Sequence, residues 1–505
     1  MRRTAIGFIG IILPVLISCE TMEHRPTLLD SMPAGYDVYL TFNPEEIGME
    51  EVLSDLTDEI SPLRENLVEV EDILGFTPLD WNGWVDALAL DPEGEIGLII
   101  DFNRNDVVLI AIYMSSSNTA VVEQYFIRIT EHADDSEILI TESGGYTIAV
   151  IAHSSTVLEQ FEESLGIGID SDESFNRFRE KSSSDLAAAE LFVRLGEFSG
   201  QDDIESLLIT CSTDETILKL NLLVLITGDD AIRYSSIIAS EPNGDDVNIP
   251  SDISGALRIS FDMETLRSII LSEGLNREFE PGMEMFGFGS VEELLDAFSG
   301  DTYFALNLEN DEYAGVLEYG LTATDAVDQM LSKIYSLFMM SGGYDLSSFD
   351  FQGSTCYGIK GYLADGIDAT EFGVFDDMFV IACGFTLQDV AEGISFENYI
   401  ASSGLRMENS GGLMLVADME PIAAIMGLNS QLNQEIDFGN IGYIVLSAGV
   451  NDGLLVMNAA LDTGEENPFL IISDVLISAG SRMLLPEPGH STQQDTLSMK
   501  ADPPF

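Results

Sequence analysis

Histidine, the side chain best suited to general acid–base work near neutral pH, is scarce in this sequence. The chain has four histidines, and no two have the spacing of a metal site or a local catalytic motif: His24, His132, His153 and His490. Serine-nucleophile elbows, phosphate-binding loops and C-x-x-C pairs are also absent from the sequence. A hydrolase built from distant residues would have to use His132 or His153. We therefore predict that the protein is not an enzyme, and keep a hydrolase with an unrecognised site as the alternative.

One acidic stretch begins in the pattern of a calcium-binding loop. The run D-S-D-E-S starts at Asp170, but position six of such a loop requires glycine and is Phe175 here. Position twelve requires glutamate and is Lys181. The stretch therefore favours a helix cap, and the sequence predicts neither a metal nor another cofactor.

The run L-D-T-G at Leu461 to Gly464 resembles the triplet of aspartic proteases, in which two such loops bring two carboxylates together. The corresponding place in the first half of the chain reads Ile226-Thr227-Gly228 and has no carboxylate. A single carboxylate cannot form the pair that this chemistry needs. We interpret the run as the end of a strand followed by a turn.

Two tryptophans lie close together in the run L-D-W-N-G-W-V-D. Trp81 and Trp84 could form an aromatic platform for a glycan or a peptide. The alternative is a helix that buries its apolar side, and it is favoured because the corresponding stretch of the second half, around Glu292, has no tryptophan. These two residues are the candidate ligand site of the sequence.

The chain begins with a short basic head and an apolar segment from Ala5 to Ser18, too short to span a bilayer. These features are typical of a signal peptide. The run L-I-S-C that ends at Cys19 resembles the lipobox of bacterial lipoproteins. The resemblance implies that Cys19 carries lipid and becomes the first residue of the mature protein. Stable anchoring needs more than one acyl chain, which such a cysteine normally receives.

Charge excludes one class of function. The chain has 20 basic and 88 acidic residues, a net charge of −68. Nucleic-acid binding requires clustered lysine and arginine, and the sequence has no such cluster. The same charge opposes docking on an anionic bilayer, so the predicted lipid is the only expected contact with the membrane.

Beyond Cys19 the chain has three cysteines, too few for a disulfide framework. Cys356 and Cys383 lie in strand-like runs and form the one plausible pair. Three small buried thiols, Cys211 included, are the favoured interpretation.

A repeated phrase organises the mature chain. An apolar run, an Asn or Asp, and a helical pattern occur in that order around Asn43, Asp262 and Asp418. The polar residue ends the strand and caps the following helix, since its side chain accepts hydrogen bonds from the first free amides. Pairs of alternating runs and helices follow in the same order in both halves. These patterns predict an α+β fold with two tandem copies of an antiparallel-sheet-plus-helices unit behind a lipoprotein signal peptide.

The predicted boundaries follow from these signals. They are a signal peptide at 1–18, the lipidated cysteine and a tether at 19–31, a first repeat at 32–245, a second repeat at 246–482 and a disordered tail at 483–505. The order of elements is similar to that of uncharacterised exported bacterial proteins with a duplicated α+β unit.

Together these observations predict an acidic lipoprotein of the bacterial cell envelope, with its folded part outside the cytoplasm. We expect it to act as a binding or structural module. The expected partners are the membrane, through the N-terminal lipid, and an unidentified protein or glycan. The alternative is an envelope hydrolase.

Overall fold

The structure is a computed structural model. It describes residues 28–51, 53, 76–77, 80–103, 106–130, 136–181, 187–195, 203–214, 216–243, 246–308, 314–342, 344–364, 367–405, 411–419, 421, 442–451 and 453–464. The predicted signal peptide, Cys19, the predicted tail and three of the histidines lie outside these residues.

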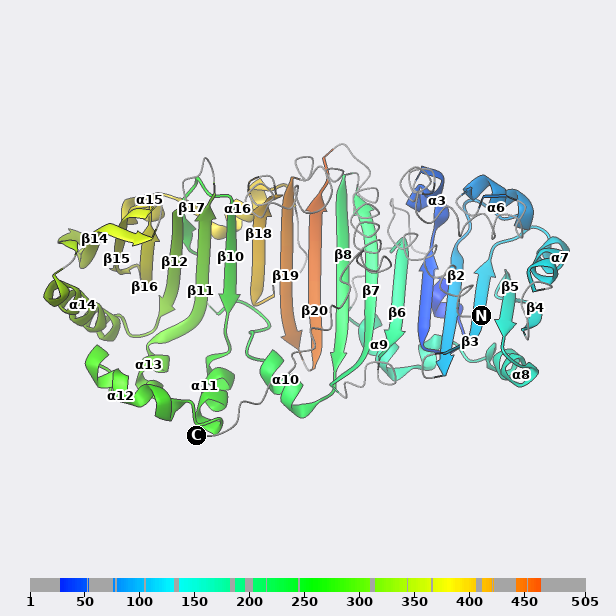
Figure 1. The fold of residues 1–505 in the computed structure, drawn as a ribbon, viewed down its shortest axis with the longest axis horizontal. Coiled ribbons are helices and arrows are strands. Elements are labelled where there is room, and N and C mark those ends of the chain that lie inside the picture. Colours follow the sequence, from blue (N-terminus) through cyan, green and yellow to red (C-terminus); the bar gives the residue numbers. More distant parts are fainter. Residues whose placement is uncertain are drawn as a thin grey trace, which may run out of the picture.

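The described strands form an α+β architecture around one long antiparallel sheet (Figure 1). The sheet has 18 strands, each hydrogen-bonded to the next. From one edge to the other they are β13 (Asp345–Phe351), β14 (Ser354–Ala364), β15 (Ile367–Phe375), β16 (Met378–Cys383), β12 (Ala314–Leu321), β11 (Phe298–Asn307), β10 (Gly255–Ser260), β18 (Leu413–Asp418), β19 (Tyr443–Asn451), β20 (Leu454–Asp462), β8 (Ile217–Ile226), β7 (Ile204–Asp214), β6 (Ala189–Arg194), β1 (Val38–Phe42), β2 (Ile96–Asn103), β3 (Asp106–Met114), β5 (Tyr146–Ala152) and β4 (Glu137–Ser143). A separate two-stranded sheet pairs β9 (Asn248–Ile249) with β17 (Ile394–Ser395).

The strand order is the same on both sides of the middle of the sheet. We call β1 to β8 the first half and β10 to β20 the second half. In the first half β1, β2 and β3 lie side by side, the hairpin β4–β5 lies outside β3, and β6, β7 and β8 lie on the other side of β1, toward the middle of the sheet. The second half has the same order, with β10 to β12, the hairpin β15–β16, and β18 to β20. The second half adds the hairpin β13–β14 at its edge. The halves meet where β8 pairs with β20, and Asn221 lies opposite Asn458 there. This repeated order is what a duplication requires, and the duplication itself stays a prediction.

Helices cover both faces of the sheet. We call the side that carries Tyr39 and Tyr303 face A, and the opposite side face B. On face A lie α2 (Leu28–Ser31), α8 (Ser155–Ser164) and α9 (Glu173–Arg179) in the first half, and α15 (Leu387–Ala391) and α16 (Phe396–Ser402) in the second. On face B lie α6 (Trp81–Leu88) and α7 (Thr119–Thr130) in the first half, and α12 (Asn276–Phe286), α13 (Val291–Asp296) and α14 (Thr324–Ser341) in the second.

Capping side chains begin several helices at the places that the sequence indicates. Asn43 accepts hydrogen bonds from the first amides of α3 (Pro44–Ile47), directly after β1. Asp262 does the same for α11 (Met263–Ser272), directly after β10. Asp172 follows the one-turn η2 helix (Ile169–Ser171) and caps α9, as expected in place of a calcium loop. Each cap satisfies amides that have no partner within the helix.

The first-half core on face A begins earlier in the chain than predicted. Leu28 and Leu29 of α2 are buried in it at 1% and 0% exposure. Their burial removes apolar side chains from water, which a polar tether would not do. The helix α2 therefore packs with the first half, although it lies within the range 19–31 that the sequence assigns to the tether.

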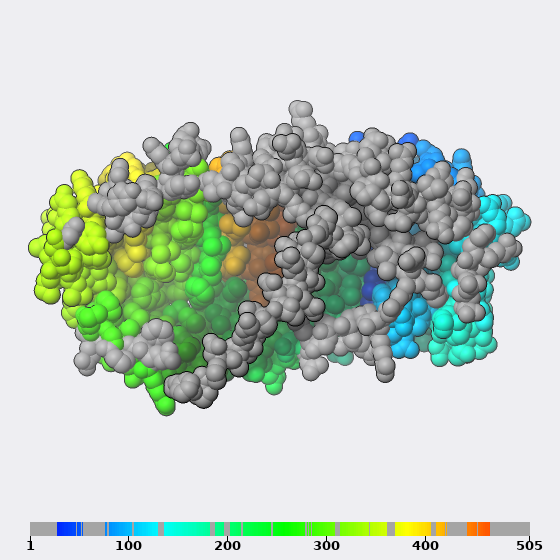
Figure 2. Space-filling view, in the orientation of Figure 1, coloured from blue at the N-terminus to red at the C-terminus, as the bar shows by residue number. Residues whose placement is uncertain are grey.

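The two halves occupy opposite ends of an elongated body, and the orange strands β19 and β20 of the second half lie near its middle (Figure 1 and Figure 2). The helix α10 (Asp229–Ser235) follows β8 and lies near α11 at the lower ends of the strands. Within the described residues, no helix has both the length and the apolar character needed to cross a membrane.

Candidate binding groove

Three charged residues stand side by side where β1, β2 and β6 meet one edge of face A. Val38 pairs with Ile100 on one side and with Val193 on the other. The adjoining residues Asp37, Asp101 and Arg194 are therefore lateral neighbours, and Arg194 N donates to Asp37 O at 2.8 Å. Side chains alternate between faces along a strand, so all three project from face A. This row lies at the boundary between the apolar core of face A and a charged surface.

Two β-bulges lie beside this row. In β7 the register shifts between Ile204 and Ser206, which leaves Glu205 as the extra residue. In β2 and β3 the register shifts between Asp101 and Phe102. A bulge turns a side chain away from its regular direction and is common next to functional sites. The first bulge places Glu205 in the lining of the same groove as the charged row. The extra residue of the second bulge is Val108 of β3, and the Phe102 side chain packs against the apolar cluster on the other face.

The N-terminus of α9 forms the opposite wall of the groove. The cap residue Asp172 accepts from Phe175 N at 3.0 Å and from Ser174 Oγ at 2.6 Å, and it forms an ion pair with Arg194. Burial by itself would raise the pKa of Asp172, but these hydrogen bonds and the charge of Arg194 hold it below the ordinary value. Asp172 is therefore ionised at neutral pH.

Together these elements enclose an open groove of about 750 Å³. Charged side chains dominate its lining, which consists of Gly35, Asp37, Asp101, Phe102, Asp172, Glu173, Ser174, Arg177, Arg194, Glu205 and Leu225. Five carboxylates and two guanidinium groups face a space open to solvent. The lining contains no histidine and no cysteine, so it lacks the usual general base and nucleophilic thiol.

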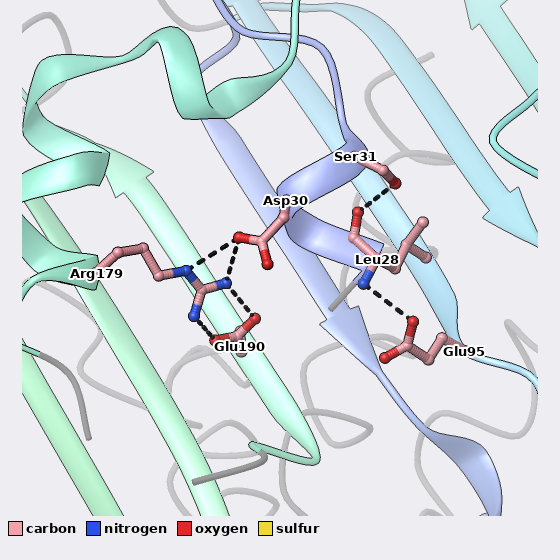
Figure 3. A network of polar contacts seen from close by, with 6 residues as sticks. All are labelled: Leu28, Asp30, Ser31, Glu95, Arg179 and Glu190. Carbon is pink, nitrogen blue, oxygen red and sulfur yellow. Dashed lines mark hydrogen bonds and ion pairs between the residues drawn. The ribbon is translucent and has the colours of Figure 1, made fainter. Parts of the chain in front are cut away.

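A partly buried polar network holds α9 in place (Figure 3). At the end of α9 away from the groove, Arg179 donates to both carboxylate oxygens of Glu190, at 2.5 and 2.9 Å, and from Nε to Asp30 at 3.1 Å. Burial lowers the pKa of Arg179, but these two carboxylates outweigh it and hold the pKa above its ordinary value. Glu190 is on β6, as is Arg194. Two ion pairs to one strand therefore fix α9 at both ends.

Aromatic packing completes the attachment of α9. Phe175 and Phe178 contact Phe192 of β6, with ring centroids 5.4 and 6.0 Å apart. Phe192 also packs on Tyr39 at 5.7 Å. The wall of the groove is thus held by a rigid core, as a preformed binding site requires.

The second half builds the same part of the sheet without charge. Asp37 and Ala256 lie at the same distance along the chain before the cap residues Asn43 and Asp262, so Ala256 is the counterpart of Asp37. Its cross-strand neighbours Ala305 and Val416 take the places of Asp101 and Arg194. All three are at most 2% exposed. The sheet therefore does not require charged residues here.

The predicted tryptophan platform is packed against protein. Trp81 and Trp84 both lie on α6 and are half-buried. Trp84 contacts Phe76 at 5.1 Å and Tyr125 at 6.3 Å between ring centroids, edge to face. Trp81 packs on a different cluster, against strands β1 and β2. Trp81 and Trp84 therefore pack in two separate apolar clusters. This packing matches the alternative interpretation of a helix that buries its apolar side.

The other motifs of the sequence lie apart from the groove. His153 is exposed at the end of β5 and does not line the groove. Asp462 ends β20, where Gly464 N donates to its side chain at 3.0 Å in a turn. Cys211, Cys356 and Cys383 are free thiols, so the possible pair is not formed. Among the described residues, no group of three or more potential ligands is arranged to hold a metal ion.

Sequence reasoning did not find the groove, because its residues are separated by more than 160 positions. Of the residues that line the groove, the sequence patterns single out only Asp172, Glu173 and Ser174, in the D-S-D-E-S run. One local signal was present. Asp37 and Arg194 are charged residues two positions from the fully buried aromatic residues Tyr39 and Phe192 of the same face, although Thr41 and Glu190 of that face are polar as well.

The described residues form an antiparallel α+β sheet protein with a charged, open groove on face A. No protein-family model and no curated protein sequence matches the chain. Among solved structures, crystal form IV of TP0453 is similar at a TM-score of 0.24 and 12% identity, with 46% of this chain and 97% of that chain covered. Crystal form I gives a TM-score of 0.22 and 13% identity over 42% of this chain and 85% of that chain. Scores this low support no conclusion about fold or function.

Proposed function

We propose that the protein is a lipid-anchored module of the bacterial cell envelope that binds a ligand in the groove between α9 and the edge of face A. The single observation that carries the binding role is the charged groove itself. The equivalent sheet positions in the second half are alanine and valine, so strand pairing itself does not require the charges of Asp37, Asp101 and Arg194. Two of these charges also make contacts within the protein, since Arg194 pairs with Asp172 and Asp37 accepts from Phe102 N at 2.8 Å.

The proposal does not include catalysis. The groove lining has carboxylates and arginines, but no histidine or thiol to act as a base or nucleophile at neutral pH. This lining supports a binding site over a hydrolase that depends on a histidine base.

The anchor is tested at Cys19. The leader and the L-I-S-C run support lipidation there. Cys19→Ser should move the protein from the membrane fraction to the soluble fraction, and wild-type protein should incorporate labelled fatty acid. A membrane-bound Cys19→Ser protein, with no label on the wild type, would contradict the proposed anchor.

The binding role is tested by thermal shift with small anionic, neutral and cationic probes. At least one probe should raise the melting temperature of the wild type in a saturable way, since a ligand that binds the folded state stabilises it. Asp37→Asn with Asp101→Asn, or Arg194→Gln, should remove the shift. If no probe of any charge gives a shift that depends on these residues, the groove is not a binding site.

A further inference from the structure

The middle of face B carries a continuous apolar area. Six adjacent strands, from β8 to β11, each contribute one residue to a row across it: Leu220, Ala459, Leu446, Leu415, Leu257 and Phe304. Leu222 and Met457 lie opposite each other in the next row. Phe304 is 37% exposed and Met457 is 39% exposed, and the other six residues are half-buried. We call these eight residues the central apolar area.

The part of the chain that the structure describes provides little cover for this area. Apart from Leu220, none of the eight residues belongs to an apolar cluster of described residues. No described helix is a main packing partner of β8, β10, β18, β19 or β20. On face A the same strands are polar at this level, with Asn221 opposite Asn458 and Asn458 opposite Ser447. An apolar sheet face normally packs against another element, because burial of apolar area stabilises the folded state.

The chain that follows β20 has the sequence of such an element. Residues 468–479 read P-F-L-I-I-S-D-V-L-I-S-A and lie outside the described residues. Asn467 and Pro468 are residue types preferred at the start of a helix. Gly480 is the type preferred directly after the end of one. The sequence therefore predicts a helix over 468–479.

The predicted helix has a wide apolar side. At helical spacing this side consists of Phe469, Ile472, Val475, Leu476 and Ala479. Asp474 and Ser478 lie on the opposite side, and Asp474 is the one charged residue of the segment. In a chain with a net charge of −68, so apolar a segment is suited to packing on an apolar surface.

The end of β20 limits where this helix can pack. Thr463 donates from N and from Oγ1 to Thr216 O, at 3.0 and 2.7 Å, so the chain leaves the sheet beside the start of β8. Gly464 turns the chain there, with a φ of +68°. The four-residue link from Gly464 to Pro468 spans at most about 14 Å. Since adjacent strands are about 4.8 Å apart, the helix begins within about three strands of β20.

The length of the helix also fits the central apolar area. Residues 468–479 would span about 18 Å as a helix. The strand β20 is nine residues long and spans about 30 Å. A helix that runs back along β20 therefore passes over Ala459 and Met457 and stays within the sheet.

A second segment near these strands is a less suitable cover. Residues 422–441 lie between β18 and β19 and are also outside the described residues. They contain Gly427, Gly439 and the polar run N-S-Q-L-N-Q-E that begins at Asn429. Glycine and a polar run interrupt the apolar side that a covering helix needs.

We propose that residues 468–479 form a helix that packs along β20 and β8 on face B and covers the central apolar area around Met457 and Leu222. The side with Asp474 and Ser478 then faces solvent. This contact lies on the opposite side of the sheet from the groove and is independent of the binding role proposed above.

Photo-crosslinking in the full chain tests the contact. The probe is p-benzoylphenylalanine in place of Met457, which is exposed on face B. The control places the same amino acid at Lys219, which is exposed on face A of the neighbouring strand β8. After irradiation, peptide mass spectrometry identifies the crosslinked residues. Gel electrophoresis separates crosslinks within one chain from crosslinks between chains.

We expect the probe at Met457 to crosslink to residues 468–479 of the same chain, and the probe at Lys219 not to. Leu476→Asp should lower the crosslinked fraction at least about fivefold, because a carboxylate held against an apolar surface loses its hydration. Ser478→Asp adds the same charge to the opposite side of the helix and should keep the crosslinked fraction within about twofold.

Four outcomes would overturn the proposal. Crosslinks to 422–441 would assign the cover to that segment, and crosslinks between chains would assign it to a second copy. A probe at Met457 that crosslinks to no part of the protein would show that the area is open to solvent. An equal loss in Leu476→Asp and Ser478→Asp would show that the contact does not depend on the apolar side of the helix.

Discussion

The two halves of the sheet share one strand order and differ in where they place charge on face A. In the first half the row at the end of the strands is charged, with Arg194, Asp37 and Asp101 at the groove. Two residues further along the same strands, the row is apolar and aromatic. It consists of Phe192, Tyr39, Ile99 and Ala111, and all four are fully buried.

The second half has the reverse arrangement. Its end row is Val416, Ala256 and Ala305, and its inner row is Met414, Arg258, Tyr303 and Glu318. Arg258 is 4% exposed and Glu318 is 2% exposed. Arg258 lies over the ring of Phe396 at 5.4 Å, and Glu318 Oε1 has no hydrogen-bond partner.

This difference separates what the fold needs from what is added to it. Hydrogen bonds between strands do not depend on side-chain identity, so the same sheet accepts a charged or an apolar residue at equivalent positions. Charge at an open edge is solvated at little cost, whereas charge in the inner row must be paired or neutralised. The first half therefore places charges at an edge open to solvent, besides the buried Glu190 that pairs with Arg179, and the second half buries Arg258 and Glu318.

The largest expected effect comes from breaking the paired arginine of the first half. Arg179→Met leaves Glu190, which is 2% exposed, without its partner. Loss of one member of a buried pair costs about 3–5 kcal/mol. We expect the lower end of that range, because the Arg179 side chain is 26% exposed and partly screened. Urea unfolding measures the loss.

Arg258→Met is the matched change in the second half. The Nε of Arg258 has no hydrogen-bond partner, and Arg258 contacts an aromatic ring and the Met414 sulfur, so no buried carboxylate is orphaned. This variant should be near neutral or stabilising. An equal loss of stability in the two variants would show that the pairing in the first half is not what distinguishes them.

A smaller effect, with a defined pH dependence, is expected at Glu318. Burial raises the pKa of Glu318 from 4.5 to about 8. Between these values the folded protein holds the proton and the unfolded chain has released it. Stability of the wild type therefore falls as pH rises through this window, by at most ~1.4 kcal/mol per pH unit. Glu318→Gln is neutral at every pH and has no such loss.

The stability difference between Glu318→Gln and wild type should therefore grow in favour of the variant from pH 4.5 to pH 8 and then level off. Urea unfolding at pH 4.5, 6.5 and 8.5 measures it, and the same substitution at the exposed Glu159 is the control. A difference that is constant over this range would mean that Glu318 is ionised in the folded protein. The reciprocal change Ala111→Glu should place the same pH-dependent cost in the first half.

The smallest expected effect tests the caps that the halves share. Asp262 accepts from Thr265 N at 2.7 Å, and Asn43 accepts from Glu45 N at 3.1 Å. Alanine at either position should cost about 1 kcal/mol, since a cap typically contributes 0.5–2 kcal/mol. Chemical denaturation of Asn43→Ala and Asp262→Ala measures both. A much larger loss in one half would show that its cap also holds tertiary contacts.

The sequence by itself determined the local features of this fold. Alternating apolar runs predicted the strands and, with helical patterns between them, the α+β class. Asn43, Asp172 and Asp262 predicted helix starts, because a cap is formed within three residues and needs no distant partner. The missing glycine and glutamate in the D-S-D-E-S run correctly favoured a cap over a calcium loop.

Only the tertiary structure decided how these elements combine. The halves share one sheet because β8 pairs with β20, and backbone pairing over such a distance leaves no local signal in the sequence. The groove exists because β1, β2, β6, β7 and α9 bring residues 37, 101, 172, 194 and 205 to one edge. Trp84 is a candidate ligand residue in the sequence, and only the tertiary structure shows that its half-buried ring packs edge to face against Phe76 and Tyr125. Residue type gives the chemistry of a side chain, and packing decides whether that side chain faces a ligand or the core.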